Sequence, residues 1–283
     1  MMKKVWVTTD CTCDLSETLL DKYDLKVVYF YIATEHGYFK DLAEITSTNI
    51  VEYFEQGGQQ IHTTAPDASE YIEFFTQMLQ KYEEIIHITI GSSVSLSYKS
   101  AIAAAKHFNN KVHVFDTGHL STGIAHFVIK AIELLEENKS IDDILATLED
   151  MKNKVSTSFI AYNADYLYRA GKVSKLVKNV CSFFKIHPVL FMKNGDMKLK
   201  TIQIGNYDKS VLRYVRRELK KPNKIKRNRL FITYSTCPVK LLAKVNALIK
   251  KLCPVEELIE TKASATVTSN CGANTIGILF VEE

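Results

Sequence analysis

The chain has 283 residues, of which 46% are hydrophobic and 24% are charged. This balance excludes a mainly disordered chain, and no apolar run reaches the ~18–20 residues that a membrane-spanning helix needs. Charge is divided unevenly: residues 1–150 hold 11 Lys, no Arg and 23 acidic residues, a net charge of −12, whereas residues 151–283 carry +16. The split predicts two domains, residues 1–155 and 156–283, and makes an acidic partner or nucleic acid a candidate for the basic half.

The first half alternates apolar strands with amphipathic helices. The predicted strands are 4–8, 25–32, 84–90 and 111–115, and the predicted helices are 15–23, 47–56, 69–82, 97–107 and 121–137. Residues 25–32, LKVVYFYI, form a continuous apolar run typical of a strand covered on both faces. A further helix is expected to begin at Ser140, whose side chain can cap it, with Asp143 at the third position. This alternation predicts βαβ units and a parallel sheet.

The second half has a different pattern. The predicted strands are 157–162, 188–192, 197–204, 229–235 and 275–281, and the predicted helices are 167–184, 208–221 and 239–252. Asn194-Gly195 stands between two of these strands and is a strong signal for a tight β-hairpin. Antiparallel hairpin elements together with helices indicate a smaller, mixed α/β domain that packs against the first one.

Several classes of site have no support in the sequence. The six cysteines are scattered without a Cys-x-x-Cys pair, which favours free thiols over structural zinc, and the eight histidines form no ligand motif. Asp10, Asp14 and Asp116 lie at predicted strand ends, where capping and loop-fixing roles are favoured over a magnesium site. Glycine-rich nucleotide-binding motifs and a nucleophile–base pair are also lacking, so we expect no enzyme, no metal and no cofactor. The N-terminal segment lacks the h-region and cleavage site of a secretory signal, so we expect a cytoplasmic protein.

Hydroxyl side chains gather where predicted strands turn into helices. Five serines fall within residues 92–101, and Thr63-Thr64-Ala65-Pro66 precedes another helix. In an open parallel sheet, ligands bind at the carboxyl ends of the strands, and hydroxyls beside free N–H groups of a helix suit an anion. Taken one at a time, each of these Ser and Thr residues is equally explained as a helix cap.

The same segments resemble the DegV family. The opening TDCTCDL resembles the family's T-D-S-T-x-D-L, and Thr63 to Pro66 stand where the family has T-S-x-P. Other segments that follow family motifs, in order, are residues 92–101, 114–117, 166–174 and 184–190. The ordered set covers nearly the whole chain, and on it the chain is identified as a member of this family of bacterial proteins.

The resemblance implies a two-domain DegV-like α/β fold, with a parallel-sheet α/β/α N-terminal domain and a smaller mixed-sheet C-terminal domain that closes a lipid tunnel. It also implies a long-chain fatty acid of the palmitate or oleate class as the ligand, and no catalytic activity of the chain itself. Such proteins present the carboxylate to a separate, ATP-dependent fatty-acid kinase subunit. Because an acyl chain of about 16 carbons costs on the order of 10 kcal/mol to leave in water, an apolar tunnel would supply most of the affinity.

Carried over by position, the carboxylate-binding residues are Thr63, Ser95, the N–H of Leu96, Ser97 and Asn270. Three positions depart from the family pattern. Leu96 replaces a glycine, so it is either strained, if φ is positive there, or narrows the site. Asn270 replaces a histidine and cannot carry charge, and Lys172 replaces an arginine and loses its bidentate fork.

A basic segment, residues 213–229, holds nine Lys and Arg among 17 residues. A solvated helix face is one interpretation and a docking surface for an acidic partner subunit is another. The candidate docking residues are Arg169, Lys172, Arg213, Arg216 and Arg217. The alternative function is a divergent regulatory or nucleic-acid-interacting module that uses the basic half, although no nucleic-acid-binding motif surrounds the cluster and we expect no stable nucleic-acid complex. Without a transmembrane segment, any membrane contact would be a transient one at the surface.

Overall fold

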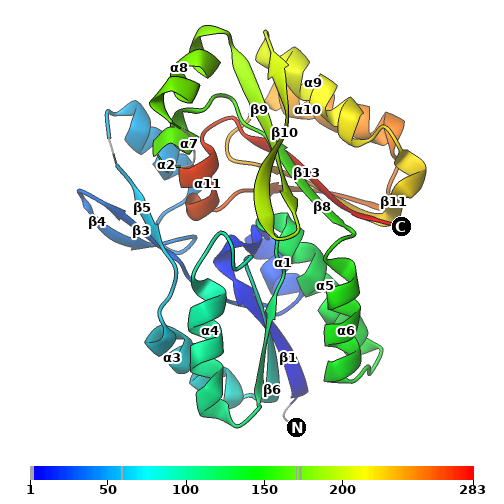
Figure 1. Cartoon of the computed structure of the whole chain (residues 1–283). Coiled ribbons are helices and arrows are strands. Elements are labelled where there is room, and N and C mark those ends of the chain that lie inside the picture. Colours follow the sequence, from blue (N-terminus) through cyan, green and yellow to red (C-terminus); the bar gives the residue numbers. More distant parts are fainter. Residues whose placement is uncertain (1–2, 59, 170, 172–173) are drawn as a thin grey trace.

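Two large sheets and one small sheet organise the molecule (Figure 1). The computed structural model describes residues 3–58, 60–169, 171 and 174–283. The first sheet is parallel and has the order β2-β1-β6-β7, with bounds Lys26–Val28, Lys3–Asp10, Tyr82–Thr89 and Val112–Asp116. The second sheet is mixed and has the order β10-β9-β8-β13-β11-β12, with bounds Asp196–Ile204, Ile186–Lys193, Val155–Ile160, Ile276–Glu282, Ile225–Tyr234 and Glu257–Lys262. The third is a small antiparallel sheet, β4-β3-β5, with bounds Gly37–Lys40, Tyr31–Thr34 and His62–Thr64.

Helices cover both faces of the parallel sheet, as its apolar strands require. The helices of this half are α1 (Glu17–Lys22), α2 (Ser47–Glu55), α3 (Ala68–Leu79), α4 (Ser97–Ala105), α5 (Thr122–Glu136) and α6 (Ile141–Met151). Along β6, Ile85 packs with α3 and α4, whereas Ile86 and Ile88 face the core that α5 shares with the second domain. Ser140 caps α6 by accepting a hydrogen bond from the Asp143 N–H, as predicted.

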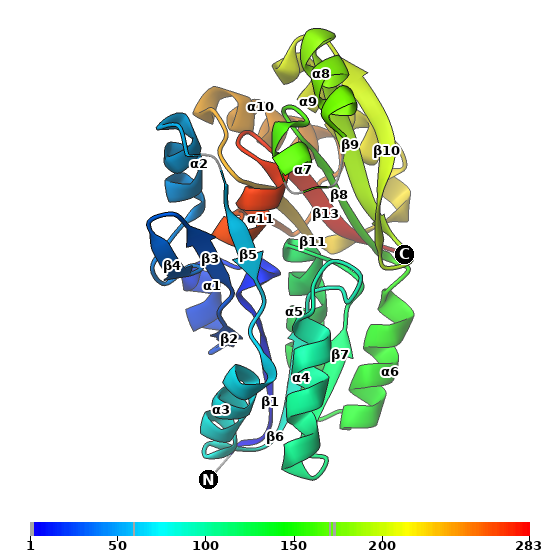
Figure 2. The ribbon, with the colours of Figure 1, turned by 60° about the vertical axis from the view of Figure 1, so that its left-hand side comes forward.

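The six-stranded sheet also has two different faces (Figure 2). The helices of this half are α7 (Asp165–Arg169), α8 (Lys175–Phe183), α9 (Tyr207–Glu218), α10 (Val239–Leu252) and α11 (Ala265–Cys271). Ile160, Leu230 and Ile278 pack under α9 and α10, whereas their neighbours Phe159 and Phe231 face the first domain. Side-chain alternation along the strands therefore places one face of this sheet on the domain interface.

Three of the predicted elements were wrong in their extent. Residues 25–32 do not form one strand, because β2 ends at Val28 and β3 begins at Tyr31 in a different sheet. The helix predicted over 167–184 is two helices, α7 and α8, and Gly171 between them has φ +69°. The predicted strand 229–235 begins earlier, since β11 starts at Ile225. The sequence patterns did not predict the small sheet, β12 or α11.

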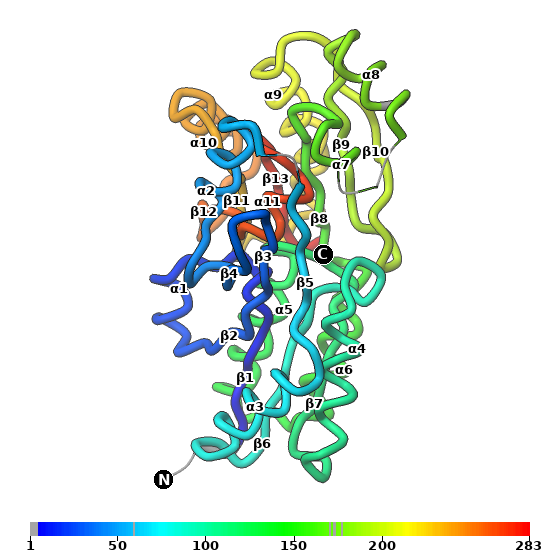
Figure 3. The backbone as a smooth tube through the Cα atoms, turned by 90° about the vertical axis from the view of Figure 1, so that its left-hand side faces the viewer, coloured from blue at the N-terminus to red at the C-terminus, as the bar shows by residue number. Residues whose placement is uncertain are grey.

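Segments from the two halves of the chain lie side by side at α11. In Figure 3 the α11 segment, which is red and unlabelled, lies next to α2 and β3 of the first half. Arg229 at the start of the apolar part of β11 makes a 2.7 Å ion pair with Glu257 and a 3.4 Å pair with Glu133 of α5. One arginine of the basic segment is therefore used inside the protein. The predicted boundary after residue 155 stays a prediction.

Candidate functional site

A loop rich in serine, Gly91–Leu96, connects β6 to α4, and two carboxylates fix it; we call it the serine loop. Asp10, at the end of β1, is fully buried and accepts hydrogen bonds from the Ile90 N–H at 3.0 Å and the Ser97 hydroxyl at 2.7 Å, one on each side of the loop. Asp116, at the end of β7, accepts from the Ser92 N–H at 3.0 Å. The strand-end aspartates thus have the loop-fixing role that the sequence favoured for them.

The tip of the β9–β10 hairpin rests on the serine loop. The hydroxyl of Ser93 donates a hydrogen bond to the carbonyl of Gly195. Asn194 and Gly195 both have positive φ, +53° and +81°, as the predicted two-residue turn demands. A Cβ on Gly91 would lie 2.9 Å from the backbone carbon of Gly118 in the loop after β7, so only glycine fits at this position of the serine loop. A Cβ on Gly118 would in turn lie 3.3 Å from the Cα atom of Gly195 in the hairpin. The hairpin of the second domain therefore covers the loop of the first.

Beneath the hairpin and the serine loop lies a cavity of about 570 Å³, the serine-loop cavity. It is lined by Phe30, Thr63, Thr64, Ala65, Pro66, Asp67, Ile90, Ser92, Ser93, Val94, Ser95, Leu96, Ser100, Leu120, Met197, Thr266, Val267, Asn270 and Cys271. These residues come from both domains. Among the lining residues that the structure describes, Asp67 is the only charged side chain, and it caps α3 by accepting hydrogen bonds from the Ser69 and Glu70 N–H groups. Hydrogen bonds from Ser69 and the first turn of the helix hold the pKa of Asp67 below its usual range.

Ser95 is oriented as a hydrogen-bond donor to the serine-loop cavity. Its oxygen accepts a hydrogen bond from the Ser97 N–H at 3.1 Å, at the start of α4. With this lone pair occupied, the hydroxyl proton is available to an anion in the cavity. The partly buried Thr63 hydroxyl lines the same cavity and makes no hydrogen bond within the described residues. Two hydroxyls, one from β5 and one from the serine loop, can therefore donate to a ligand in this cavity.

Leu96 stands at the edge of this cavity without backbone strain. Its φ and ψ are −81° and −5°, in the right-handed region, and its side chain is 68% exposed. A leucine where the family has glycine was expected either to strain the backbone or to narrow the site. The right-handed backbone excludes strain, so the expectation that remains is a cavity narrowed at its edge by the leucine side chain. The Leu96 N–H precedes the first turn of α4 and donates no hydrogen bond within the described part of the chain.

Of the predicted carboxylate-binding residues Asn270 and Ser97, only Asn270 faces the serine-loop cavity. Asn270 lies on α11 and lines the cavity, but its Nδ2 donates one hydrogen bond back to the Thr266 carbonyl at 2.9 Å. One amide proton and the amide oxygen remain for a ligand. Ser97 is fully buried and does not line the cavity, because its hydroxyl lies between Asp10 and the Tyr71 hydroxyl, 2.7 Å from each. Its part in the site is to position the serine loop.

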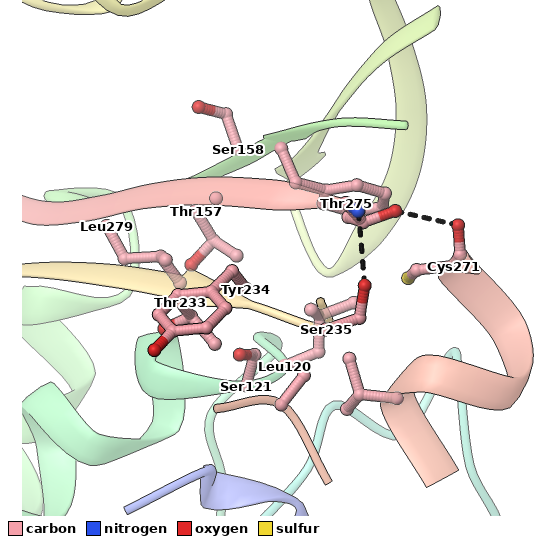
Figure 4. A pocket seen from close by; sticks show the side chains of 14 residues that line it. Leu120, Ser121, Thr157, Ser158, Thr233, Tyr234, Ser235, Cys271, Thr275 and Leu279 are labelled. Carbon is pink, nitrogen blue, oxygen red and sulfur yellow. Dashed lines mark hydrogen bonds between the residues drawn. The ribbon is translucent and has the colours of Figure 1, made fainter. Parts of the chain in front are cut away.

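A second, smaller cavity lies against the six-stranded sheet, and Figure 4 shows the side chains that line it. This inner cavity of about 20 Å³ shares Leu120, Val267 and Cys271 with the serine-loop cavity. The rest of its lining comes from β8, β11, β13 and the segments beside them: Ser121, Thr157, Ser158, Phe159, Thr233, Tyr234, Ser235, Ala263, Thr275, Gly277 and Leu279. The two cavities therefore adjoin, one beside the serine loop and the other at the interface between the domains.

Most hydroxyl groups around the inner cavity are satisfied by the protein itself. In Figure 4 the Thr275 hydroxyl donates to the Cys271 carbonyl at 2.8 Å, and the Ser235 oxygen accepts from the Thr275 N–H at 3.1 Å. Ser158 points away from Thr157 and binds the Tyr214 hydroxyl at 2.9 Å on the other face of β8. Because these polar atoms are engaged, carbon atoms form most of the surface offered to a ligand.

The chain also matches known proteins along its whole length. The model of a family described as "Uncharacterised protein, DegV family" matches residues 4–283. The chain belongs to the DegV family. A DegV domain-containing protein of Caldanaerobacter subterraneus subsp. tengcongensis is 24% identical over 283 residues, which cover 100% of both chains.

Solved DegV structures share the fold. The structure of a DegV family protein from Thermus thermophilus, described for its fatty acid binding, has a TM-score of 0.87 and 25% identity and covers 99% of this chain and 100% of that one. A Thermotoga maritima protein whose structure is described as revealing a fatty acid binding function has a TM-score of 0.85 and 23% identity, with 100% of both chains covered. The predicted membership and the predicted DegV-like α/β fold are both confirmed.

In this DegV protein, two buried carboxylates of the first domain hold the helix α11 of the second. Asp14 accepts a hydrogen bond from the Ser264 N–H at 2.8 Å, and Asp41 accepts from the Ala265 and Thr266 N–H groups, each at 2.8 Å. These are the unpaired N–H groups of the first turn of a helix. Burial raises the pKa of Asp14 to about 7 and also raises the pKa of Asp41, against the hydrogen bonds that they accept.

Sequence patterns did not indicate Asp41, nor Thr266 and Val267 of the cavity lining on α11, and Asn270 on this helix was indicated only by the resemblance to the family. This helix has only seven residues, ATVTSNC, and contains no apolar repeat. Its position depends on Asp14 and Asp41, which lie more than 220 positions earlier in the chain. Thr266 and Val267 therefore reach the cavity through a contact that no local pattern could indicate.

The predicted docking residues do not form one surface. Arg169 lies at the end of α7, with its guanidinium 4.8 Å from the ring centroid of Phe54, on the α11 side of the six-stranded sheet. Arg213, Arg216 and Arg217 lie on α9, against the opposite face. Of these, Arg213 donates to the Ile204 carbonyl, Arg217 donates to Thr201, and Arg216 is exposed. Lys172 lies outside the described residues.

Proposed function

We propose that this protein binds a long-chain fatty acid of the palmitate or oleate class between its two domains. The observation that carries the proposal is that the two cavities adjoin and share Leu120, Val267 and Cys271: donor hydroxyls line the serine-loop cavity, and mainly apolar surface lines the inner cavity at the six-stranded sheet. An amphiphile with one anionic head and a long apolar tail has this distribution of chemistry. The fatty acid binding described for the Thermus thermophilus relative supports the same ligand class.

The head group would be held without an ion pair. Thr63, Ser95 and the Leu96 N–H are neutral donors, and Asn270 can add one amide proton. Hydrogen bonds from neutral groups to a carboxylate are stronger than those to a neutral acceptor, yet they leave the carboxylate reactive. We infer that the chain is a non-catalytic carrier that presents this carboxylate to a separate acyl-phosphorylating kinase in the cytoplasm.

Native mass spectrometry of the purified protein tests the ligand class directly. We expect a bound species of roughly 300 Da, the mass range of a fatty acid with 16 to 18 carbons, because burying such a chain is worth on the order of 10 kcal/mol. Delipidated protein should take up added palmitate or oleate in titration calorimetry. A protein that is always empty and takes up neither lipid would overturn the proposal.

Removing either head-group hydroxyl should weaken lipid binding without unfolding the protein. For Thr63→Ala and Ser95→Ala we expect palmitate affinity to fall by about 1–3 kcal/mol each, because each substitution removes one donor to a buried carboxylate. Thr76→Ala is the matched control, since its hydroxyl bonds the Ile72 carbonyl on the exposed part of α3. Titration calorimetry measures all three, and unchanged affinity in the first two variants would exclude these hydroxyls from the site.

The transient membrane contact that we include in this function is supported by α8. Four large apolar side chains are exposed on and just after this helix, at spacings that place them on one face: Leu176, Val180, Phe183 and Phe184. The same segment carries Lys175, Lys178 and Lys185. An exposed apolar face with lysines beside it is typical of helices that lie on anionic membranes. Among the described residues, no helix is long and apolar enough to cross a membrane.

Replacing two of these apolar residues should release the protein from vesicles. For the double variant Leu176→Ser, Phe183→Ser we expect about 2 kcal/mol weaker partitioning into phosphatidylglycerol vesicles, roughly 30-fold, because the buried apolar area is lost. Vesicle co-sedimentation measures this. Val239→Ser is the control, because Val239 is 83% exposed but lies on α10, across the six-stranded sheet. Equal sedimentation of the double variant and the wild type would contradict membrane contact through α8.

A nucleic-acid-binding module is the less favoured alternative. Arg213 and Arg217 donate hydrogen bonds within the protein, and Arg229 pairs with Glu257 and Glu133. Fewer arginines of the basic segment are thus available to phosphates than the sequence suggested. If this alternative held, nucleic-acid affinity would fall steeply with salt concentration, and no measurable binding at 50 mM salt would remove it.

A further inference from the structure

A glycine inside a central strand forms part of the wall of the inner cavity. Gly277 of β13 pairs with Phe159 of β8 on one side and with Thr233 of β11 on the other, and all three line this cavity. In Figure 4, Leu279 projects from β13 to the side where Thr233 and Leu120 lie. Because side chains alternate along a strand, position 277 faces the same side as Leu279, toward the first domain.

The backbone conformation does not require a glycine at position 277. Gly277 does not adopt the positive φ that favours glycine in turns. A glycine inside a strand weakens it, because it has no side chain to pack, and it often marks a place where a ligand comes close to the backbone. A Cβ there would lie 3.1 Å from Leu279 Cδ1, 3.1 Å from the Ser158 carbonyl oxygen and 3.5 Å from Phe159 Cβ. A side chain at position 277 would therefore take up space at the wall of the inner cavity.

The inner cavity suits an apolar group better than water. Every Ser and Thr hydroxyl among the lining residues that the structure describes has a partner in the protein: Ser121 with Asp14, Thr157 with His119, Ser158 with Tyr214, Thr233 with Thr122 and Thr261, Ser235 with Gly272, and Thr275 with Cys271. At about 20 Å³ the cavity can hold one water-sized group. A buried water needs about two to four polar partners, whereas a methyl group needs none. The cavity therefore fits the end of an apolar chain.

We propose that Gly277 determines the length of the acyl chain that this protein prefers, with the terminal methyl group of the ligand in the inner cavity. The inference rests on the proposed function, because it places the carboxylate at the serine loop. Leu120, Val267 and Cys271 line both cavities, so the chain passes from one cavity to the other beside these three side chains.

A closed end beyond Gly277 makes affinity depend on chain length. On the other face of β13, Ile278 is fully buried under α9 and α10, so the packed sheet is a wall at this end. Each further methylene group that is buried raises the affinity about fourfold until the terminal methyl group reaches the inner cavity. Carbon atoms beyond that length find no apolar space, and the affinity stops rising.

Saturated fatty acids from laurate to arachidate measure this dependence, by displacement of the fluorescent fatty acid cis-parinarate from delipidated protein. For the wild type we expect the affinity to rise with length and to level off at one acid, the preferred length. For Gly277→Ala it should level off one or two carbons earlier, and the acid of preferred length should bind about tenfold more weakly, while laurate keeps its wild-type affinity.

Leu279→Val tests the same wall without a change at Gly277. This second variant is needed because the approach of a Cβ to the Ser158 oxygen is by itself a reason for glycine. Leu279→Val removes one carbon beside Gly277 and should move the preferred length to a longer acid. Ile278→Val is the matched control, because it removes one carbon from the other face of the same strand and should keep the wild-type preference.

The inference is wrong if neither substitution moves the preferred length, or if Gly277→Ala weakens the binding of all the acids by the same factor; the fatty-acid site then stands. Should Gly277→Ala not fold, Leu279→Val decides alone, and an unchanged preference in that variant would overturn the inference. If no fatty acid displaces cis-parinarate from the wild type, the proposed function fails and the assignment of Gly277 fails with it.

Discussion

Replacing Asp10 by alanine is expected to lower the free energy of unfolding by about 3–5 kcal/mol, because the change leaves several buried donors without an acceptor. The Asp10 carboxylate accepts hydrogen bonds from the Tyr71 hydroxyl at 2.7 Å, the Ser97 hydroxyl at 2.7 Å and the Ile90 N–H at 3.0 Å. Asp10 is completely buried at the carboxyl edge of the parallel sheet, and His87 Nε2 lies 3.4 Å from its Oδ1 atom. Urea denaturation followed by circular dichroism measures the loss.

The effect should extend to the ligand site, since two of these bonds hold the ends of the serine loop. Ser97 orients Ser95 through its backbone N–H, so palmitate affinity should fall in Asp10→Ala even where the protein remains folded. Asp67→Ala is the matched control: it removes a carboxylate that caps an exposed helix end, which should cost less stability than the loss of a buried acceptor. If Asp10→Ala were no more destabilising than Asp67→Ala, the serine loop would not depend on the buried carboxylate.

Local patterns predicted the elements whose stability is decided locally. The Asn194-Gly195 turn needs two residues that tolerate positive φ, and both adopt it. Ser140 caps α6 as its side chain allows, and the apolar run of β6 is buried on both sides as expected of a central parallel strand. The charge split predicted two domains, and the resemblance to the DegV family then indicated how the elements are assembled, which spacing and periodicity alone could not do.

Elements that depend on distant partners escaped prediction. The run 25–32 reads as one strand because all its residues are apolar, but Tyr31 pairs with β4 and β5 instead of β1. β5 has three residues and α11 has seven, too few for a period to show. Ser97 was placed in the carboxylate site by its motif, and only the contact with Asp10 and Tyr71 reveals that it faces the core.

The effects of the departures from the family pattern could also not be predicted without the three-dimensional structure. A leucine at a glycine position permitted two outcomes, and the right-handed backbone of Leu96 decides between them. Asn270 keeps the place of the family's histidine on α11, yet part of its donor capacity goes to the Thr266 carbonyl. The carboxylate site proposed for this chain is therefore one of neutral donors, and its affinity should not follow the titration of a histidine at position 270.

The stability of the protein should depend on pH through Asp14, whose pKa burial raises to about 7. For such a group the folded protein holds a proton that the unfolded chain, with a carboxyl pKa near 3.9, has already released. Between these pKa values folding stability falls as pH rises, and above about pH 7 the loss is complete. Relative to Asp14→Asn, which cannot ionise, the wild type should lose about 3 kcal/mol between pH 5 and pH 8. Urea denaturation of both proteins at each pH measures the difference.

Taking the difference between the two proteins is necessary because other buried groups act in the opposite direction. Burial lowers the pKa of His119 to about 4 and of His126 to about 3, so both histidines make stability rise with pH up to their unfolded pKa near 6.5. That contribution is common to wild type and Asp14→Asn and cancels. Asp67→Asn is the control: hydrogen bonds lower the pKa of Asp67, so its difference from wild type should be flat over this range. A flat curve for Asp14→Asn as well would mean that Asp14 holds α11 as a carboxylate throughout, with no proton linked to the contact between the domains.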